Sequence, residues 1–344
     1  MIYFRADGNA RIGMGHLMRT LSIAKEVQKE EECVFLCSDE ASGLVVKENG
    51  LKVILTKTQA FSMEEAEWIA EKYDDQGTIL VDSYLATNEY FKILRKNKKV
   101  FYLDDLGEEK FDVDVIINYN SYADEKSYIS LYEGVKNPPE FIIGSRFVPL
   151  RDEFVNARAS ANNEVKNILL TTGGGDIDNI SGSILDKLLS SLDENDIKIN
   201  VVIGAMNPNY EKLIKMAKAD SRVLIHRDVR KMSELMKNMD AAISAGGSTC
   251  YELCAMNIPF VVFSYADNQI KLSSDMDKKK AACLAGHIFN ENSKKTVINN
   301  ICEKMKLIIQ DESVRNLMRE HSLNVTDGLG AKRLAKMLVG KMEG

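Results

Sequence analysis

The chain has 344 residues, a length that favours two domains over one. Hydrophobic residues account for 45% and charged residues for 28% of the sequence, and 5 prolines and 21 glycines are too few for long disordered or collagen-like tracts. The net charge of −6 disfavours a nucleic-acid-binding protein, which needs a concentrated basic surface. The basic run Arg95–Lys99 is better explained as a solvated helix end than as a nucleic-acid patch.

Signals for membranes, disulfides and metals are absent from the sequence. No apolar run approaches the roughly 18 residues of a transmembrane helix, and the N-terminus leads directly into a strand rather than a signal segment. The six cysteines form no C-x-x-C pair and have no histidine at zinc-finger spacing, so we interpret them as small buried hydrophobic residues. We therefore expect a cytoplasmic protein with no stable membrane insertion and no bound metal.

Short apolar runs alternate with longer amphipathic runs through the first half of the chain. The apolar runs predict strands at Ile2–Arg5, Cys33–Cys37, Lys52–Leu55, Thr78–Val81, Val100–Leu103, Val115–Ile117 and Phe141–Gly144. The amphipathic runs predict helices at Gly15–Lys29, Ala41–Glu48, Met63–Tyr73 and Glu89–Arg95. The strand candidates are apolar on both faces, as in parallel strands covered by helices, so the pattern predicts an open α/β sheet.

The alternation of strand and helix candidates is interrupted by a polar segment and then resumes. Residues 151–164 are expected to be a linker between a domain at 1–150 and a second domain at 165–344, whose last helices could pack back on the first. The second domain has a helix candidate near 179–192 and strand candidates at Val165–Thr172, Ile199–Ile203, Val223–Ile225, Asp240–Ser244 and Pro259–Phe263. After the last of these strands, helices are expected to dominate to the C-terminus. Two such domains form a cleft, into which strand-end loops of both can point.

The loop Asp7–Arg19 is the first candidate for chemistry. It lies between the first strand and the first helix and contains Gly13, Gly15 and His16. Glycines allow close backbone approach, a helix N-terminus attracts anions, and histidine can act as a base near neutral pH. The spacing matches neither G-x-G-x-x-G nor a P-loop, which weakens the dinucleotide and ATP hypotheses. The structural alternative is a glycine-rich turn with a hydrogen-bonded histidine.

Two further glycine loops follow strands of the second half. Thr171–Asp176 contains three consecutive glycines and could hold a phosphate with backbone N–H groups, or could be a tight turn that packs closely. Ser244–Glu252 turns at Gly246–Gly247, where Ser248 or Thr249 is expected to cap a helix. The carboxylate of Glu252 could accept hydrogen bonds from a ribose, or belong to a capping box; its spacing fits both.

Polar residues also follow two other strands, in the segments Val81–Tyr84 and Ser264–Gln269. Such groups can orient a small ligand, although each alone is ordinary loop chemistry. Asp104–Asp105 could suggest a metal pair, but no further ligand accompanies it and a turn is the better interpretation. The remaining histidines are interpreted as structural or surface residues.

Taken together, these motifs resemble the PseG family, the UDP-2,4-diacetamido-2,4,6-trideoxy-β-L-altropyranose hydrolases of pseudaminic acid biosynthesis. The matching segments are Arg5-Ala-Asp7-Gly8-Asn9 with Gly13-x-Gly15-His16-x-x-Arg19, Asp82-x-Tyr84, Asp104-Asp105, Arg151-x-Glu153-Phe154, Gly173-Gly-Gly-Asp176, Ala245-Gly-Gly-Ser-Thr with Glu252, Asn268-Gln269, and Asp327-Gly328-Leu-Gly330-Ala-x-Arg333. The resemblance covers nearly the whole chain. The Gly-Gly-Ser-Thr block is less specific, since MurG-like glycosyltransferases of the GT-B fold share it.

The resemblance implies two Rossmann-like domains with a central cleft, as in the GT-B fold, and no metal or cofactor. It implies that His16 is the base that activates water for attack on the anomeric carbon, with inversion and release of UDP. It assigns sugar binding to Asp7, Asn9, Gly13, Gly15, Arg19, Tyr84, Arg151, Asn179, Asn268 and Gln269. It assigns UDP binding to Gly173, Gly174, Gly175, Gly246, Gly247, Ser248, Thr249 and Glu252.

Two alternatives to the hydrolase stay open at this point. A GT-B glycosyltransferase would pass the sugar to an acceptor hydroxyl rather than to water, and a nucleotide-sugar-binding module would keep the fold without catalysis. His16 in the opening loop argues against the binding module. The sequence specifies no oligomeric state.

Overall fold

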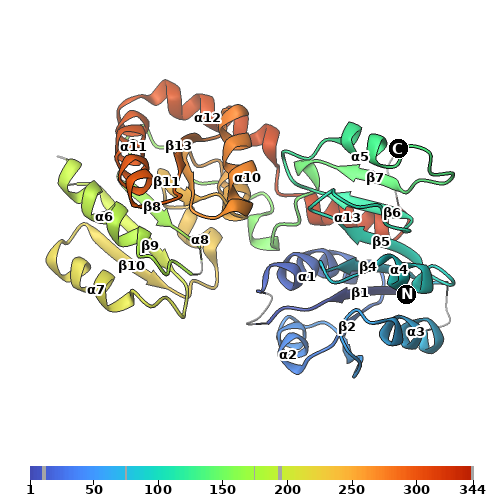
Figure 1. Cartoon of the computed structure of the whole chain (residues 1–344). Helices are drawn as coiled ribbons and strands as arrows, with labels where there is room; N and C mark the ends of the chain where they lie inside the picture. The colour runs from blue at the N-terminus through green and yellow to red at the C-terminus, as the bar shows by residue number, and fades with distance from the viewer. Residues whose placement is uncertain (10–12, 74–75, 174, 193–195, 342–344) are drawn as a thin grey trace. The chain divides into compact units, whose positions relative to one another are not determined.

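The computed structural model describes residues 1–9, 13–73, 76–173, 175–192 and 196–341. The chain divides into two compact units, which are each described separately. Unit 1 comprises Met1–Asp152 and Leu329–Gly344, and unit 2 comprises Glu153–Gly328. Each unit is a parallel sheet with helices packed against it (Figure 1).

Unit 1 contains a seven-stranded sheet with the order β3-β2-β1-β4-β5-β6-β7. Its strands are β1 (Ile2–Ala6), β2 (Cys33–Cys37), β3 (Val53–Leu55), β4 (Thr78–Asp82), β5 (Lys99–Leu103), β6 (Val115–Asn118) and β7 (Glu140–Ile143). All neighbouring strands are parallel, with Ala6 of β1 opposite Asp82 of β4. The chain runs outward from β1 in one direction and returns to β4 on its other side, so a topological switch point lies between these two strands. Ligands of open α/β sheets bind at such points, beyond the carboxyl ends of the strands.

Helices cover both faces of this sheet. They are α1 (Gly15–Gln28), α2 (Glu40–Glu48), α3 (Met63–Lys72), α4 (Asn88–Leu94), α5 (Glu125–Leu131) and α13 (Gly330–Leu338), with a short 3₁₀ helix η1 (Ser145–Phe147). The face that carries Phe4 packs against Leu21 of α1 and Leu334 of α13. The opposite face, which carries Tyr3, packs against Ile69 of α3 and Phe91 of α4. This burial of both faces explains why the strands are apolar throughout.

Unit 2 contains a six-stranded parallel sheet with the order β10-β9-β8-β11-β12-β13. Its strands are β8 (Asn167–Thr171), β9 (Lys198–Ile203), β10 (Val223–Arg227), β11 (Ala241–Ala245), β12 (Phe260–Ser264) and β13 (Cys283–His287). Its helices are η2 (Asp152–Phe154, beginning at the last residue of the first segment of unit 1), α6 (Ile180–Ser191), α7 (Tyr210–Ala219), α8 (Met232–Met236), α9 (Thr249–Met256), α10 (Asp267–Lys278), α11 (Glu291–Gln310) and α12 (Glu312–Val325). One core joins Ile184 of α6 and Ile301 of α11 to the sheet. Here the switch point lies between β8 and β11.

The sequence correctly predicted the α/β fold class and all seven strands of the first half, within one or two residues. It missed β13, because Cys283–His287 combines small residues with a glycine at φ +127 and lacks a run of branched apolar side chains. It also missed α5, which lies in a segment that shows no long apolar face.

Among the helices in the part of the chain that the structure describes, none combines the length and apolar character that crossing a membrane requires. All six cysteines are free thiols; Cys283 is half-buried and the other five are buried, as expected for small hydrophobic residues. Burial raises the pKa of Cys33 to about 11 and that of Cys250 to about 12, so these thiols stay protonated.

Candidate functional site

The carboxyl edge of unit 1 gathers polar side chains around its switch point. Helix α1 begins beyond the end of β1 and supplies His16 and Arg19, while Asp82 is the last residue of β4. Asp105 follows β5 and Tyr119 follows β6. Residues at the carboxyl ends of four neighbouring strands of the sheet, β1, β4, β5 and β6, therefore meet at one place, because the ends of neighbouring parallel strands lie side by side.

His16 and Asp82 form a histidine–carboxylate pair. Nδ1 of His16 lies 2.7 Å from Oδ1 of Asp82, whose side chain is completely buried, while the histidine side chain is 14% exposed. Thr20 donates its hydroxyl to the other carboxylate oxygen at 3.0 Å. An ionised carboxylate can only accept, so the Nδ1 of His16 carries the proton. Neutral His16 then has a lone pair on Nε2, and this atom has no hydrogen-bond partner among the described residues.

Arg19 holds the carboxylate of Asp82 in place from the other side. Its Nε and Nη2 donate to the two oxygens of Asp82 at 2.6 and 2.5 Å, a bidentate arrangement. Burial alone would raise the pKa of Asp82, but the charge and hydrogen bonds of Arg19 outweigh it, and the pKa is lowered. Nη2 also lies 3.0 Å from His16 Nδ1, where two donors converge on one carboxylate oxygen. Asp82 is therefore ionised and fixes the tautomer of His16.

Asp105 extends this cluster and was not among the site residues expected from the sequence. Its Oδ2 accepts from Arg19 Nη1 at 2.7 Å and from the hydroxyl of Tyr84 at 3.0 Å. Its Oδ1 is buried and has no hydrogen-bond partner among the described residues. The phenol of Tyr119 lies 2.7 Å from the same Arg19 nitrogen. For the pair Asp104–Asp105, the sequence favoured a turn over a metal site. The turn is confirmed for Asp104, whose carboxylate accepts from the backbone N–H groups of residues 106 and 107.

The ring of Tyr84 packs against one side of the His16 imidazole. Its ring meets that of His16 edge-on, with 4.6 Å between centroids, and 56% of the residue is exposed. Burial of the hydroxyl and the charge of Asp105 raise the pKa of Tyr84, so the phenol remains a donor. Tyr84, which the resemblance assigns to sugar binding, therefore lies beside His16.

Asp7 lies in a different cluster from His16. Its carboxylate accepts from Arg5 Nη1 and from the hydroxyl and backbone N–H of Ser38, each at 2.8 Å. Arg5 also donates twice to Glu65, at 3.0 and 2.9 Å, and both side chains are fully buried. Both oxygens of Asp7 are used within the protein, so its observed role is to fix the start of the loop rather than to face a ligand.

The rest of the opening loop is only partly described, because residues 10–12 lie outside the described ranges. Asn9 donates to Asp39 at 3.0 Å, and its carbonyl accepts from the N–H of Gly13 at 2.8 Å. Gly13 has φ +82, a conformation that favours glycine, and Gly13 and Gly15 are both exposed. Arg151 directly precedes η2, where the chain leaves the first segment of unit 1.

In unit 2, the two glycine loops follow β8 and β11, which are neighbouring strands. At the first loop, Asp176 occupies the N-terminus of α6, because its carboxylate accepts from Ile180 N at 2.6 Å and from Ser181 N at 3.1 Å. Gly173 and Gly175 are exposed, and Gly174 is not among the described residues. The backbone N–H groups of Ile180 and Ser181 are therefore already satisfied by the protein.

The second loop differs, because α9 begins without a side-chain cap. Ser248 is the N-cap residue but makes no capping hydrogen bond, so the predicted cap is wrong. Ser248 has helical φ and ψ angles of −56° and −25°, instead of the extended backbone that lets a cap reach back. The backbone N–H groups of Ser248 and Thr249 have no acceptor within the described ranges. Glu252 lies half-buried one turn into the helix.

Close packing positions this loop. A Cβ on Gly246 would lie 2.8 Å from the backbone oxygen of Gln269, so no side chain fits there. The side chain of Gln269 accepts from the N–H of Tyr265 at 3.0 Å, and the Tyr265 hydroxyl donates to the carbonyl of Thr172 at 2.7 Å. Tyr265 thus connects the β8 and β12 loops. Asn268 is exposed in the first turn of α10.

Asn179 is the remaining expected sugar contact. It precedes α6 with φ +50, and its amide lies over Gly182, where a Cβ would be 2.5 Å from Nδ2. Its Oδ1 is buried without a hydrogen-bond partner among the described residues. Asn179 is therefore the N-cap residue of α6, directly before the two amides that donate to Asp176.

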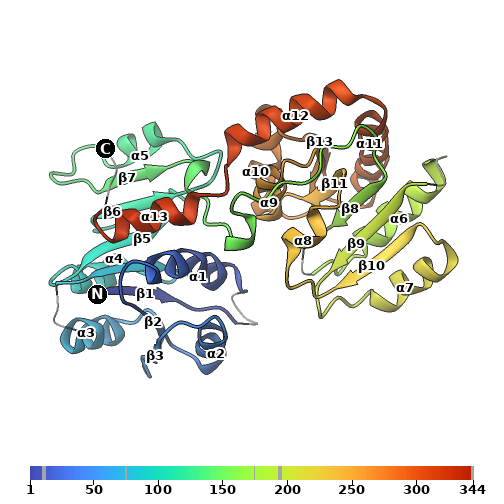
Figure 2. The same cartoon turned by 180° about the vertical axis from the view of Figure 1, so that it is seen from behind.

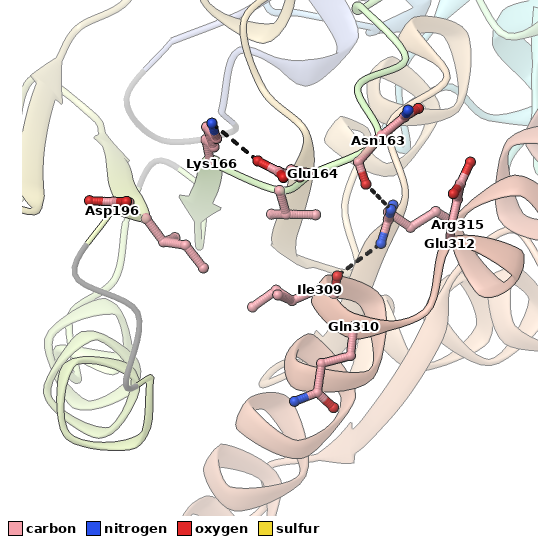
Figure 3. Close-up of a pocket in the computed structure, with 10 residues that line it drawn as sticks. Asn163, Glu164, Lys166, Asp196, Ile309, Gln310, Glu312 and Arg315 are labelled. Carbon is pink, nitrogen blue, oxygen red and sulfur yellow. Dashed lines mark hydrogen bonds and ion pairs between the residues drawn. The ribbon is translucent and has the colours of Figure 1, made fainter.

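A separate cavity of about 620 Å³ lies at the opposite end of the unit 2 strands (Figure 3). Its lining includes Lys166 and Ile197, which immediately precede β8 and β9. The guanidinium of Arg315 donates to the carbonyls of Ile308 and Ile309 at 2.8 and 2.9 Å and to that of Asn163. Arg315 therefore satisfies the C-terminus of α11, and the position at the amino ends of the strands separates this cavity from the glycine loops.

No group of three or more His, Cys, Asp or Glu side chains within the described parts of the chain is placed to hold a metal ion. Two other histidines contact neighbouring polar groups: His226 Nε2 lies 2.9 Å from Asn200 Oδ1, and His287 Nδ1 lies 2.6 Å from the hydroxyl of Ser264. Burial lowers the pKa of His226. These contacts agree with structural roles for both.

The chain was compared with known proteins, and no family model matches it. An uncharacterized protein of Methanocaldococcus jannaschii is 29% identical over 286 residues, which cover 79% of this chain and 57% of that protein. The UDP-2,4-diacetamido-2,4,6-trideoxy-beta-L-altropyranose hydrolase of Campylobacter jejuni is 26% identical over 280 residues, 81% of this chain and 96% of that enzyme. The resemblance inferred from the motifs is therefore confirmed as similarity over most of the chain.

Glycosyltransferases are also similar, over a shorter stretch or in fold alone. A UDP-N-acetylglucosamine–N-acetylmuramyl-(pentapeptide) pyrophosphoryl-undecaprenol N-acetylglucosamine transferase of Campylobacter jejuni is 33% identical over 153 residues, 42% of each chain. The crystal structure of Acinetobacter baumannii MurG matches with a TM-score of 0.67, 12% identity, and coverage of 98% of this chain and 99% of that one. This structural match confirms the two-sheet α/β fold of the GT-B type.

Proposed function

We propose that this protein hydrolyses a UDP-sugar, with His16 as the base that activates water. The observation that carries the proposal is the His16–Asp82 pair at the switch point of unit 1, which leaves Nε2 of His16 available. A histidine oriented by a buried carboxylate is the arrangement that positions a neutral imidazole to accept a proton. The similarity to the Campylobacter hydrolase suggests UDP-2,4-diacetamido-2,4,6-trideoxy-β-L-altropyranose as the substrate.

The proposed reaction has one displacement step. Nε2 of His16 takes a proton from water while the water oxygen bonds to the anomeric carbon. The bond from that carbon to the diphosphate oxygen breaks, and its electron pair leaves with UDP, so the anomeric centre inverts. Asp82 stabilises the imidazolium that forms, and the proton then passes to solvent. General-base catalysis of this kind typically contributes about 10²- to 10⁴-fold.

We assign UDP to the edge of unit 2. The uncapped start of α9 offers two N–H groups and the positive end of a helix dipole, which suit a diphosphate and favour its departure as an anion. Glu252 can accept hydrogen bonds from the two ribose hydroxyls, as the resemblance implies. The start of α6 is already capped by Asp176, so the β11 loop is the stronger candidate for the phosphates. We also propose that Gly173 and Gly175 of the β8 loop lie beside the phosphates of UDP.

The sugar is assigned to Arg19, Tyr84, Asn268 and the backbone of the opening loop. Arg19 is 13% exposed and is already paired with two carboxylates, so it acts mainly by holding Asp82 and Asp105. Tyr84 places an exposed ring beside His16 and can pack on an apolar face of the sugar. Asn9, Gly13, Gly15, Arg151, Asn179 and Gln269 remain proposed sugar contacts.

A glycosyltransferase is the second candidate, because part of the chain is 33% identical to an N-acetylglucosamine transferase. In that case His16 would take its proton from an acceptor hydroxyl. The two hypotheses predict different requirements: a hydrolase releases free UDP and free sugar without any acceptor, whereas a transferase is slow until an acceptor is added.

The test is an assay of the purified chain with a panel of UDP-sugars, with and without a chelator, that measures UDP release. We expect release from the 2,4-diacetamido-2,4,6-trideoxy sugar without an acceptor, unchanged by the chelator. No release without an acceptor would overturn the hydrolase proposal. A second measurement is the affinity for UDP. Glu252→Ala should weaken UDP binding by about tenfold or more, while the control Glu211→Ala, at an exposed position, should not. Equal UDP affinity for the unaltered protein and both variants would refute the ribose assignment.

A further inference from the structure

The outer edge of the unit 1 sheet is formed by β7, which pairs only with β6 among the described strands. The backbone N–H groups of Glu140 and Gly144 donate to carbonyls on the β6 side, each at 2.9 Å. Backbone groups of successive residues point alternately to the two sides of a strand, so those of Phe141 and Ile143 point away from β6. Their N–H groups have no acceptor among the described residues. An edge of this kind is a template for another strand.

Helix α5 lies beside β7 on one face of the sheet (Figure 2). The rings of Tyr128 and Tyr132 pack against that of Phe141, with centroids 5.5 and 5.4 Å apart. A cavity of about 560 Å³ lies beside this contact, lined by α5, the turn after it, Pro138 and Phe141. Ile129 lines the same cavity and is 57% exposed. An exposed isoleucine is ordinary by itself, but one that lines a cavity beside an unpaired strand edge indicates a surface for a partner.

The residues of α5 and of the following turn that face this cavity form one stripe. They are Lys126, Ile129, Ser130 and Glu133, at the spacing i, i+3, i+4 and i+7 that lies on one side of a helix. The stripe has a cation at its start, an anion at its end, and Ile129 and Ser130 in the middle. Lys126 and Glu133 are both exposed, and neither side chain has an ion-pair partner among the described residues.

This stripe is complementary to itself when a second copy is related by a two-fold axis. Two such stripes that run antiparallel bring Lys126 of each copy beside Glu133 of the other, and bring the two Ile129 side chains together near the axis. A two-fold axis perpendicular to the sheet also reverses the direction of β7, so the two edges meet antiparallel, and it keeps both α5 helices on the same face. One symmetry operation therefore pairs the charges, fills the cavity and completes the strand edge.

We propose that the protein forms a two-fold homodimer through unit 1, in which the β7 edges pair antiparallel and the α5 helices pack against each other over the joined sheet. The backbone groups of Phe141 and Ile143 form the new ladder, and Ile129 of each copy covers the cavity of the other. The charge pattern selects a second copy over a different protein, because a cation and an anion equidistant from the centre of the stripe match its own reverse. The net charge of −6 per chain opposes association only weakly at physiological salt, where charges more than about 8 Å apart are largely screened. This inference is independent of the proposed UDP-sugar reaction.

The test measures the molar mass of the full chain and of its variants by analytical ultracentrifugation at several concentrations. I129D places two carboxylates near the axis, and L44D makes the matched change at a leucine of α2 that is 58% exposed. K126E puts like charges opposite each other at both ends of the interface, whereas K126E/E133K reverses the stripe and so restores the match. Circular dichroism and thermal unfolding of each protein check that it is folded.

We expect the unaltered protein, L44D and K126E/E133K to have the mass of two chains, and the dimers of I129D and K126E to be weaker by about tenfold or more. A single-chain mass for the unaltered protein at every concentration would overturn the proposal and leave the edge to a different protein. A dimer that I129D weakens no more than L44D does would also overturn it. A dimer that K126E weakens and K126E/E133K does not restore would overturn the antiparallel pairing of the two stripes.

Discussion

Two arginine–carboxylate clusters of unit 1, around Arg5 and around Arg19, resemble each other in composition and differ in how completely their hydrogen bonds are made within the protein. In the first, Arg5 and Glu65 are fully buried, and both oxygens of Glu65 accept hydrogen bonds, Oε1 from Thr56 as well as Arg5. In the second, Arg19 binds Asp82 and Asp105 near the surface. Two acceptors there lack partners in the described part of the chain, Oδ1 of Asp105 and Nε2 of His16.

This difference separates a structural cluster from a chemical one. A buried ion pair whose hydrogen bonds are all made within the protein has no donor or acceptor available for a ligand. A cluster that keeps a base and a carboxylate oxygen unpaired at the carboxyl edge of a sheet can act on one. Each cluster contains an aspartate from the motifs that carry the family resemblance: Asp7 in the first, and Asp82 and Asp105 in the second. The sequence alone therefore does not separate the roles of the two clusters.

The largest effect on catalysis short of losing His16 itself is expected from Asp82→Asn. Asparagine keeps the shape but can present an amide N–H to His16, which favours the wrong tautomer, and it leaves Arg19 without its bidentate partner. We expect kcat to fall by about 10²- to 10⁴-fold. The measurement is UDP release under saturating substrate, with Asp112→Asn, a surface carboxylate paired with Arg95, as the control. Near-normal turnover by Asp82→Asn would place both clusters in the structural class.

Glu65→Gln should affect stability instead. It leaves the guanidinium of Arg5 buried with only Asp7 as an ionised partner. Removing one partner of a buried pair typically costs about 3–5 kcal/mol. We expect the free energy of unfolding in urea to drop by this amount, while kcat of the folded fraction changes less than twofold. A large fall in kcat at unchanged stability would contradict the division between the clusters.

Tyr84→Phe should have a moderate effect on turnover. The substitution keeps the ring beside His16 but removes the hydroxyl that donates to Asp105. Hydrogen bonds to charged groups contribute about 1.5–3 kcal/mol, so we expect kcat/KM to fall by about tenfold. Tyr210→Phe on α7 is the control and should react like the unaltered protein. An unchanged kcat/KM for Tyr84→Phe would show that Asp105 does not act through this tyrosine.

The smallest expected effect is on the pH dependence of stability. The pKa of Asp82 is lowered from its ordinary value of 3.8 by Arg19 against the effect of burial. A lowered folded-state pKa stabilises the protein above pH 3.8, and this contribution is lost as pH falls through the folded pKa. The difference in unfolding free energy between the unaltered protein and Asp82→Asn should therefore shrink below about pH 4. A difference that stays constant down to pH 2 would show that Asp82 is not stabilised by Arg19.

The sequence predicted the sheet of unit 1 well because its strands are short apolar runs with buried faces. It assigned His16, Arg19 and Tyr84 to one substrate only through the motif resemblance, since no local pattern joins residues 16, 19 and 84. Asp105 was missed for the same reason: its contact with Arg19 spans 86 positions and depends on β4 and β5 lying side by side. Contacts of this kind become visible only with the topology.

The two helix starts of unit 2 show a second limit of sequence reasoning. Both follow a glycine-rich loop, and serine or threonine stands at the predicted cap of α9. The structure places the satisfied start at α6, through Asp176, and the unsatisfied one at α9. The deciding quantities are the φ and ψ angles of Ser248 and the reach of Asp176, which composition does not encode.

The most direct test of the central claim is UDP release by His16→Ala. The substitution removes the proposed base and leaves Asp82, Arg19 and all of unit 2 unchanged. We predict that kcat falls by about 10²- to 10⁴-fold while the Kd for UDP stays within twofold of that of the unaltered protein. Turnover within tenfold of normal, measured in the same assay without an acceptor, would contradict the account of His16 as the base of a UDP-sugar hydrolase.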